Sequence, residues 1–434
     1  MKKIIKRVLF TLLTLVALYG IGRFIDVAYG SWQFVKRQPY LVAQTQTSMA
    51  IKWQTPKSEV GKVLYGLTPD TLSHTLNEEE TSKKHSLTLD KLNKCTQYYY
   101  KVISTSLNID NNGRHFRTLC EEKPTQRLWV IGDSGKLGAD QREVYAQLYK
   151  YIQNDFKELD MWLLLGDNAY SSGTQKQFNK TLFKPFIELV KRYTPWAVAG
   201  NHDARRWAFY DIFDFPTNAE AGGTASGHEE FYSVEDANLH LIVLDSETVS
   251  RADDGDMAEW LRKDLHANKK PWVIVAFHTP PYSDGGHKSD SDWDSRGRLK
   301  DMRETFVPIF DAYGVDLVLS GHSHGYERSK LIIKHLGKSD TFSAQNIVQD
   351  KKTDYTKSLM QKKNSGTIYQ VCGSSAKLDG ATYSHPALPY SLKEMGSLII
   401  ELTPTTLTSK FVNINGKIAD EFKITKNLGK NNER

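Results

Sequence analysis

The chain has 434 residues, of which 39% are hydrophobic and 11% aromatic. This apolar content excludes an intrinsically disordered chain, and the length indicates more than one domain. The formal net charge of +6 is concentrated in residues 1–24, which contain no acid and five basic residues: Lys2, Lys3, Lys6, Arg7 and Arg23. The rest of the chain carries only +1 (6 − 5), so composition gives no case for a nucleic-acid-binding surface.

Residues 1–30 are predicted to be a signal peptide or a signal anchor. The basic segment Lys2–Arg7 precedes a largely apolar run of fifteen residues, Val8–Gly22. This run is shorter than the roughly 20 residues of a spanning helix, which favours a cleaved secretory signal. No Ala-x-Ala motif follows, so an uncleaved anchor stays open. Either interpretation exports the body of the protein to the periplasm, the extracellular space or the outer side of a membrane, with membrane contact only through an uncleaved leader.

The three cysteines, Cys95, Cys120 and Cys372, are too few for a disulfide framework in a chain of this length. Cys95 and Cys120 fall at the start and the end of two adjacent predicted strands, and we hypothesise that they form a disulfide. Cys372 follows the apolar run Thr367–Val371 and is predicted to be an inert core thiol.

Residues 31–122 show the pattern of an all-β domain. Short strands separated by turn signals are predicted, a spacing typical of a β-sandwich. They are Met49–Gln54, Gly61–Tyr65, His85–Leu89, Tyr98–Ile103 and His115–Thr118. The segment Leu92–Tyr98 resembles the tyrosine corner of fibronectin type III-like domains. Because the region lacks residue types suited to chemistry, we interpret it as a scaffold or a partner surface.

Residues 123–426 alternate apolar strands with helices, which indicates an α/β domain with buried strands. Helices are predicted at Asp140–Asn154, Gln175–Arg192, Met257–His266 and Leu299–Tyr313. The polar segment 337–365 is interpreted as a surface loop or lid. Four strands are predicted to close the domain: Gly366–Cys372, Ser397–Leu402, Leu407–Asn413 and Ile418–Ile424. Residues 427–434 are predicted to be a tail, with fraying from Thr425 onward.

Five apolar strands of this domain end in residues that can bind a metal ion. Ligands of open α/β sheets bind outside the carboxyl ends of the strands, so these residues are expected at one rim. Glycine precedes several of them and permits a sharp turn and a close approach. Two of the runs end in an aspartate: Leu128–Asp133, and Met161–Asp167, which is followed three residues later by Tyr170. The run Trp196–Gly200 is followed by Asn201, and Trp272–His278 ends in a histidine. The run Val315–Gly321 is followed by His322 and His324.

Seven candidate ligands result: Asp133, Asp167, Tyr170, Asn201, His278, His322 and His324. These seven residues are too many for one metal ion. If one carboxylate bridges two ions, the seven residues supply four contacts to each ion. Mixed oxygen and imidazole ligands suit iron, zinc or manganese, and the lack of a thiolate argues against a structural zinc site. Taken singly, Asp133 could cap a helix and Tyr170 or His278 could be core residues. Their combination at five strand ends is what indicates a site.

These motifs resemble those of the purple acid phosphatases, which belong to the calcineurin-like metallophosphoesterases. The matching segments are Gly-Asp133-x-Gly, Gly-Asp167-x-x-Tyr170, Gly-Asn201-His202-Asp203, Val275-x-x-His278 and Gly321-His322-x-His324. The resemblance runs from about Pro39 to Lys426. It implies an α/β catalytic domain, an α+β sandwich of metallophosphoesterase type, preceded by an all-β fibronectin type III-like sandwich.

The resemblance also implies two metal ions, Fe(III) and a divalent ion (Zn, Mn or Fe). The ligands of Fe(III) would be Asp133, Tyr170 and His324. Those of the divalent ion would be Asn201, His278 and His322, with Asp167 bridging the two ions. A phenolate is a hard anionic ligand, so Tyr170 is expected to favour Fe(III) over Fe(II).

Two further histidines are candidate catalytic and substrate-binding residues. By the resemblance, His202 contacts the phosphate together with Asn201 and gives a proton to the leaving alkoxide. His287 lies nine residues past His278 in a polar loop. An outer-shell histidine often occurs there in the family, and a solvated loop residue is the alternative.

Four charged residues near these motifs have less specific interpretations. Arg205 and Arg206 follow the Gly-Asn-His-Asp turn and could clamp phosphate, with a solvated helix start as the alternative. Glu327 and Arg328 follow His324 and are interpreted as residues that support the ligands or the fold.

The sequence therefore predicts an exported acid phosphatase-like enzyme that hydrolyses small phosphate monoesters by attack of a metal-bound hydroxide. Two ions neutralise phosphate oxygens and lower the pKa of a bound water. A phosphodiesterase or nucleotide hydrolase on the same site is the nearest alternative, because the metal ligands do not distinguish one ester from two. A non-catalytic exported binding or adhesion protein is the alternative of a different class.

Overall fold

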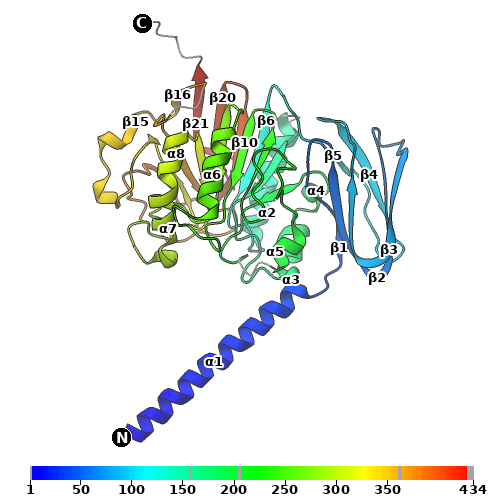
Figure 1. Cartoon of the computed structure of the whole chain (residues 1–434), viewed down its shortest axis with the longest axis horizontal. Coiled ribbons are helices and arrows are strands. Elements are labelled where there is room, and N and C mark those ends of the chain that lie inside the picture. The colour runs from blue at the N-terminus through cyan, green and yellow to red at the C-terminus, as the bar shows by residue number, and fades with distance from the viewer. Residues whose placement is uncertain (1, 156–157, 204–206, 360–362, 381, 428–434) are drawn as a thin grey trace.

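The computed structural model describes residues 2–155, 158–203, 207–359, 363–380 and 382–427. One long helix, α1 (Lys2–Trp32), precedes a β domain and a larger catalytic domain (Figure 1). The predicted leader, residues 1–30, thus falls within one continuous helix that extends to Trp32. Arg205 and Arg206 lie outside the described residues.

The β domain is one hydrogen-bonded sheet that bends over its own core. Its strands are β1 (Arg37–Val42), β2 (Met49–Gly66), β3 (His74–Leu89), β4 (Gln97–Ile103) and β5 (His115–Arg117). The prediction of separate strands at Met49–Gln54 and Gly61–Tyr65 was wrong, because β2 continues through both. The exposed polar stretch between them has the composition of a turn, but it extends alongside β3 with a shifted register. Strand β2 pairs with β1 before this shift and with β4 after it.

The cysteines behave as the sequence predicted. Cys95 and Cys120 form a disulfide, which confirms the hypothesised pair. The hydroxyl oxygen of Tyr98 accepts a hydrogen bond from the amide of Asn93 at 2.9 Å, the contact expected of a tyrosine corner. Cys372 is buried, and burial raises the pKa of its thiol to about 12, so the group stays protonated and inert.

Two mixed seven-stranded sheets form the catalytic domain. The first has the order β16 (Asp354–Ser358), β21 (Ile418–Asn427), β20 (Thr406–Asn413), β19 (Gly396–Leu402), β6 (Gln126–Ile131), β7 (Met161–Leu164) and β8 (Pro195–Ala197). The second has the order β18 (Tyr390–Leu392), β13 (Tyr326–Arg328), β17 (Ile368–Cys372), β12 (Leu317–Ser320), β11 (Trp272–Ala276), β10 (Leu239–Val243) and β9 (Tyr232–Asp236). A small hairpin joins β14 (Leu331–Ile332) and β15 (Ile347–Gln349).

The two sheets pack face to face, and helices cover their outer faces. Alternate residues of β10 show this layering, since Leu241 belongs to the core shared by both sheets and Ile242 packs under α6 and α8. The α-helices are α2 (Ala139–Asp155), α3 (Gln175–Phe178), α4 (Ile187–Val190), α5 (Trp207–Ile212), α6 (Asp256–Ala267), α7 (Arg298–Asp301) and α8 (Val307–Tyr313). Shorter helical segments are η1 (Asn179–Phe183), η2 (Asp294–Gly297), η3 (Met302–Phe306), η4 (Ser339–Thr341) and η5 (Ala344–Asn346).

The predicted fold class is confirmed, whereas several element boundaries were wrong. The expected helices Gln175–Arg192 and Leu299–Tyr313 are each interrupted by a π-helical turn, η1 and η3. Segment 337–365 is not only a loop, because β16 pairs in parallel with β21. Its strand character was hidden by Lys357, which is buried in an ion pair with Asp316 at 2.8 Å. Strand β21 also orders the chain as far as Asn427.

Candidate metal centre

The carboxyl ends of five strands meet at one edge of the sandwich. Three belong to the first sheet (β6, β7, β8) and two to the second (β11, β12). The rim expected of a single open sheet is thus shared by two sheets. Their backbones approach closely: a Cβ on Gly132, which follows β6, would lie 2.3 Å from the carbonyl oxygen of Cys372 in β17. Asp133 and Asp167 themselves have a φ of 53°, a left-handed conformation that is held by the surrounding fold.

Three of the predicted ligands form one group. The hydroxyl of Tyr170 donates a hydrogen bond to Asp133 Oδ1 at 3.1 Å and lies 3.1 Å from His324 Nε2. His324 Nε2 is 3.3 Å from the same carboxylate oxygen. A phenol oxygen, a carboxylate oxygen and an imidazole nitrogen therefore converge within hydrogen-bonding distance of one another.

The other predicted ligands lie beside this group. His278 Nε2 is 3.2 Å from Asn201 Oδ1 and 3.4 Å from Asp167 Oδ1. The ligand atoms of Asp133, Asp167 and His278 lie within 4.8 Å of one another. The ring of His322 is 5.0 Å from that of His278, centroid to centroid. Asp167 is thus close to both groups, where a bridging carboxylate is needed.

Each of the three histidines has its other ring nitrogen held by an acceptor. His278 Nδ1 donates to the carbonyl of Leu165 at 2.7 Å, and His324 Nδ1 is paired with the carboxylate of Asp379. His322 Nε2 is 2.6 Å from Ser295 Oγ, which leaves Nδ1 as the nitrogen available to a metal. Such partners fix the tautomer and the ring orientation of metal-ligating histidines.

A bound cation would compensate the negative charges of the acidic groups in this cluster. Burial and the neighbouring Asp133 carboxylate raise the pKa of Asp167, and burial with both carboxylates raises that of Tyr170 strongly. Burial lowers the pKa of His278, but Asp167 and Asp133 outweigh it and raise it to about 9. Among the described residues, no Lys or Arg forms an ion pair with either carboxylate. Buried, crowded acidic donors of this kind fit a multivalent metal ion.

His202 lies at the open side of the cluster. Its side chain is 35% exposed, and its ring is 4.6 Å from that of Tyr170. Nδ1 is 2.7 Å from the carbonyl of Ser171, which fixes the ring and leaves Nε2 free. Nε2 is 3.9 Å from Asp167 Oδ2, so it borders the cluster without joining it.

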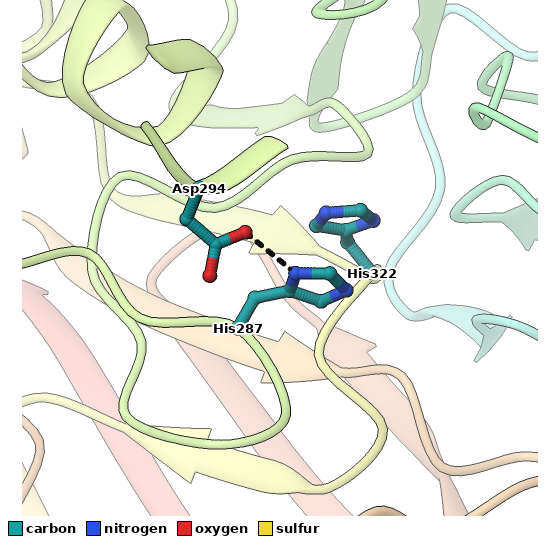
Figure 2. Close-up of side chains that lie close together, drawn as sticks. All are labelled: His287, Asp294 and His322. Carbon is teal, nitrogen blue, oxygen red and sulfur yellow. Dashed lines mark hydrogen bonds and ion pairs between the residues drawn. The ribbon is translucent and has the colours of Figure 1, made fainter. Parts of the chain in front are cut away.

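His287 lies between Asp294 and His322, as Figure 2 shows. Its ring stacks on that of His322 with centroids 3.7 Å apart, and its Nδ1 donates to Asp294 Oδ1 at 2.8 Å. The loop that carries it is held by Glu327, whose buried carboxylate accepts hydrogen bonds from the amide of Asp284 and the hydroxyl of Ser283. Arg328 is paired with Asp420 of β21 instead, and supports the fold.

Four residues near the cluster were missed by sequence reasoning. Asp379, Ser295 and Asp294 orient histidines, and Lys377 places its ammonium 5.6 Å from the centroid of the Tyr170 ring. For Lys377 Nζ no hydrogen-bond or ion-pair partner is found among the described residues. Lys377 and Asp379 lie in a loop, and Asp294 and Ser295 begin the short segment η2. None of the four belongs to a motif, so no local signal could have identified them.

Comparisons with known proteins concern the family of the chain. Residues 126–326 match the family model of the calcineurin-like phosphoesterases, and residues 37–118 match the purple acid phosphatase N-terminal domain. Purple acid phosphatase 18 of Arabidopsis thaliana is 28% identical over 327 residues, which are 70% of this chain and 68% of the relative. Purple acid phosphatase 1 of Ipomoea batatas is 29% identical over 309 residues, 65% of this chain and 62% of the relative.

A structural comparison gives the same fold. Purple acid phosphatase PPD1 from yellow lupin (Lupinus luteus) superposes with a TM-score of 0.70 at 17% identity, over 90% of this chain and 74% of the lupin chain. The protein is thus a calcineurin-like metallophosphoesterase, a class of metal-dependent phosphoric ester hydrolases. The N-terminal domain places it more narrowly: the chain belongs to the purple acid phosphatase family, as its motifs predicted.

Proposed function

We propose that the protein is an exported phosphatase that hydrolyses small phosphate monoesters with the help of Fe(III) and a divalent ion. The observation that carries this proposal is the convergence of Asp133, Tyr170 and His324 on one side of Asp167, and of Asn201 and His278 on the other. A structural role would not require two adjacent sets of oxygen and imidazole donors around one buried carboxylate.

The donor sets assign the two ions. Fe(III) would be held by Asp133, Tyr170 and His324, because a phenolate and a carboxylate suit a hard trivalent ion. The divalent ion (Zn, Mn or Fe) would be held by three neutral groups, namely Asn201, His278 and His322, with Asp167 shared. When bound, this pair of ions neutralises phosphate oxygens and lowers the pKa of water enough to supply the nucleophile.

The chain's own side chains then act on the substrate. His202 presents its Nε2 at the open side. In the doubly protonated ring, whose Nδ1 donates to the carbonyl of Ser171, Nε2 can donate to a phosphate oxygen and pass its proton to the leaving alkoxide. His287, held by Asp294, is the second candidate for this proton, and Asn201 joins both histidines in binding the phosphate. The ammonium of Lys377 adds a positive charge at the same rim, beside Tyr170.

A phosphate monoester as the substrate is supported by the name of one relative. A relative from Allium cepa, 29% identical over 315 residues, is named a phosphoenolpyruvate phosphatase, and that substrate is a small monoester. Export is supported by the apolar N-terminal helix, which is placed before the domains and leaves its span Ile5–Gly22 unburied.

The test combines a spectrum with two substrates. Purified protein is expected to contain two metal ions, to show a visible tyrosinate-to-Fe(III) charge-transfer band, and to hydrolyse p-nitrophenyl phosphate faster than bis(p-nitrophenyl) phosphate. Two zinc or manganese ions without colour would contradict the iron assignment, and faster hydrolysis of the bis ester would make the protein a phosphodiesterase. Bound metal without hydrolysis of either ester would favour the non-catalytic alternative.

A further inference from the structure

The apolar part of α1 has no partner within the described protein. Its segment Ile5–Gly22 has a mean hydropathy of 1.6, and none of it is buried. These 18 residues span about 27 Å at 1.5 Å per residue, close to the roughly 30 Å hydrocarbon core of a bilayer. Phe24 and Tyr29 follow toward the domains, where aromatic side chains suit the membrane interface. The occupant that fits this surface is a lipid bilayer.

The last turns of the same helix are docked on the catalytic domain. Gly30 is buried against Thr174, and a Cβ on Gly30 would lie 2.7 Å from Thr174 Cγ2. The rings of Phe24 and Trp32 pack on Trp207, with centroid distances of 6.2 and 5.3 Å. The helix is unbroken between the apolar segment and this contact. A bilayer-spanning segment would therefore be joined rigidly to the domain.

This contact is made with the elements that follow the metal centre in sequence. Thr174 caps α3 four residues after Tyr170, and Trp207 begins α5 five residues after His202. In Figure 1, α1 leaves the catalytic domain at the end where α3, α5 and α7 lie, while β21 points to the opposite end. The carboxyl ends of β6, β7 and β8 face the same end as α1, because β6 runs antiparallel to β19 and β19 runs parallel to β21.

The rim of the metal centre is suited to a lipid surface. Trp293 is 88% exposed and lies six residues past His287, and Leu137 is 40% exposed and lies four residues past Asp133. Lys136 and Arg296 are exposed near them in sequence, as are Asp140 and Asp292, of which Asp292 is paired with Lys338 at 3.1 Å. Aromatic and apolar side chains mixed with basic ones are typical of surfaces that face anionic headgroups.

We propose that α1 is retained as a membrane anchor and holds the metal-centre face opposite the bilayer surface, where the substrate is a phosphate monoester carried by a lipid. The substrate part rests on the function proposed above, whereas the orientation does not. Cleavage after Gly20-x-Gly22 would cut the continuous helix just before the turns that contact Thr174 and Trp207. A protein released from the membrane would not need these contacts.

The orientation of the metal-centre face toward the bilayer is tested by a measurement that does not depend on enzymatic activity. The full chain is placed in vesicles that contain headgroup spin-labelled lipid, with one dye on Trp293→Cys or on Asn427→Cys at the end of β21. Cys372 is buried and the other cysteines are paired, so the new thiol is the reactive one. Quenching at 293 is expected to exceed that at 427 at least threefold. Equal quenching, or an intact mass that begins after Gly22, overturns the proposal.

The substrate is tested with a matched pair of variants. Gly30→Leu clashes with Thr174, whereas Gly22→Leu meets nothing within 4 Å on the same helix. Gly30→Leu is expected to lower the ratio of phosphatidate hydrolysis in vesicles to p-nitrophenyl phosphate hydrolysis at least fivefold, and Gly22→Leu to leave it unchanged. An unchanged ratio in Gly30→Leu overturns the lipid substrate. If the unaltered chain does not hydrolyse p-nitrophenyl phosphate, this counts against the proposed function. The quenching measurement would still decide the orientation of the domain on the membrane.

Discussion

His287 stacks on His322, with ring centroids 3.7 Å apart and planes inclined by 14° (Figure 2). The stack and the bond to Asp294 together fix His287 beside a proposed metal ligand while leaving its Nε2 unused. The ligand atoms of His287, Asp294 and His322 also lie within 4.8 Å of one another, so this group could hold a metal ion, and the metal content of a His287 variant separates that role from an action on substrate.

His287→Ala is therefore expected to lower kcat for p-nitrophenyl phosphate about 100-fold, at the low end for a group that transfers a proton. Its metal content is expected to stay at two ions, measured by elemental analysis. Asp294→Asn replaces the carboxylate that accepts the Nδ1 proton with a neutral amide and should lower kcat less. An equal loss of metal and of activity in His287→Ala would instead make it a residue that supports the metal site.

Tyr170→Phe is expected to remove the visible band. The variant keeps the ring but loses the oxygen that lies between Asp133 and His324, so no phenolate can donate charge to Fe(III). The spectrum and the iron content are measured together, and Tyr149→Phe, an exposed tyrosine of α2, is the control. A band that survives in Tyr170→Phe would place the iron ligand elsewhere.

Asp379→Asn is expected to weaken metal binding about 10- to 100-fold, the usual effect of losing the partner of a metal-ligating histidine. The carboxylate is paired with His324 Nδ1, and an amide cannot stabilise the ring in the same way. Competition with a chelator measures the change, and Asp70→Asn, which alters an exposed carboxylate of the β domain, controls for charge. Equal chelator sensitivity in the two variants would remove Asp379 from the site.

The difference between Asp379 and Asp133 explains how far the sequence could predict this centre. Asp133 follows a buried strand directly, so a local pattern of apolar residues, glycine and carboxylate places it at the strand end. Asp379 and Ser295 reach the histidines only through loops whose course depends on packing between distant segments. Ser295 moreover lies in a left-handed turn, with a φ of 49°, that no local residue preference would suggest.

The same reasoning applies to the fold. Buried strands such as β11 were predicted because every side chain in them is apolar and buried. Strand β16 was not, because its inward-facing Lys357 is stabilised by Asp316, a partner that lies some forty residues away in sequence. The five strand ends are divided between two sheets because β6 pairs with β19 and β12 pairs with β17. The pattern of apolar residues within one strand does not encode such pairing.

Lys377→Gln is expected to raise KM for phosphate monoesters about tenfold and to leave the visible band unchanged. Its ammonium lies 5.6 Å from the centroid of the Tyr170 ring, so it acts at the rim where the anionic substrate enters. Lys101→Gln, which removes an exposed charge of β4, is the control. A fall in kcat with unchanged KM would mean that Lys377 acts in the chemical step and not in binding.

His240 makes the stability of the catalytic domain depend on pH. It is buried in β10, with Nε2 2.7 Å from Asp264 of α6 and Nδ1 3.4 Å from Glu235 of β9. Burial lowers its pKa, but the two acids outweigh this and raise it from the usual 6.5 of a histidine to about 9. Because the folded protein holds this proton more tightly than the unfolded chain, the stabilisation is complete below about pH 6.5 and is lost as pH rises through about 9.

Urea unfolding is therefore expected to show a lower midpoint at pH 9.5 than at pH 6, and His240→Gln should remove much of that difference. The variant has no proton to lose in this range, so its curve depends only on the remaining groups. His266→Gln, at an exposed position near the end of the same helix α6, is expected to keep the full difference. If His240→Gln and the unaltered chain lose stability equally between the two pH values, the buried histidine is neutral in the folded protein and its acids carry the proton instead.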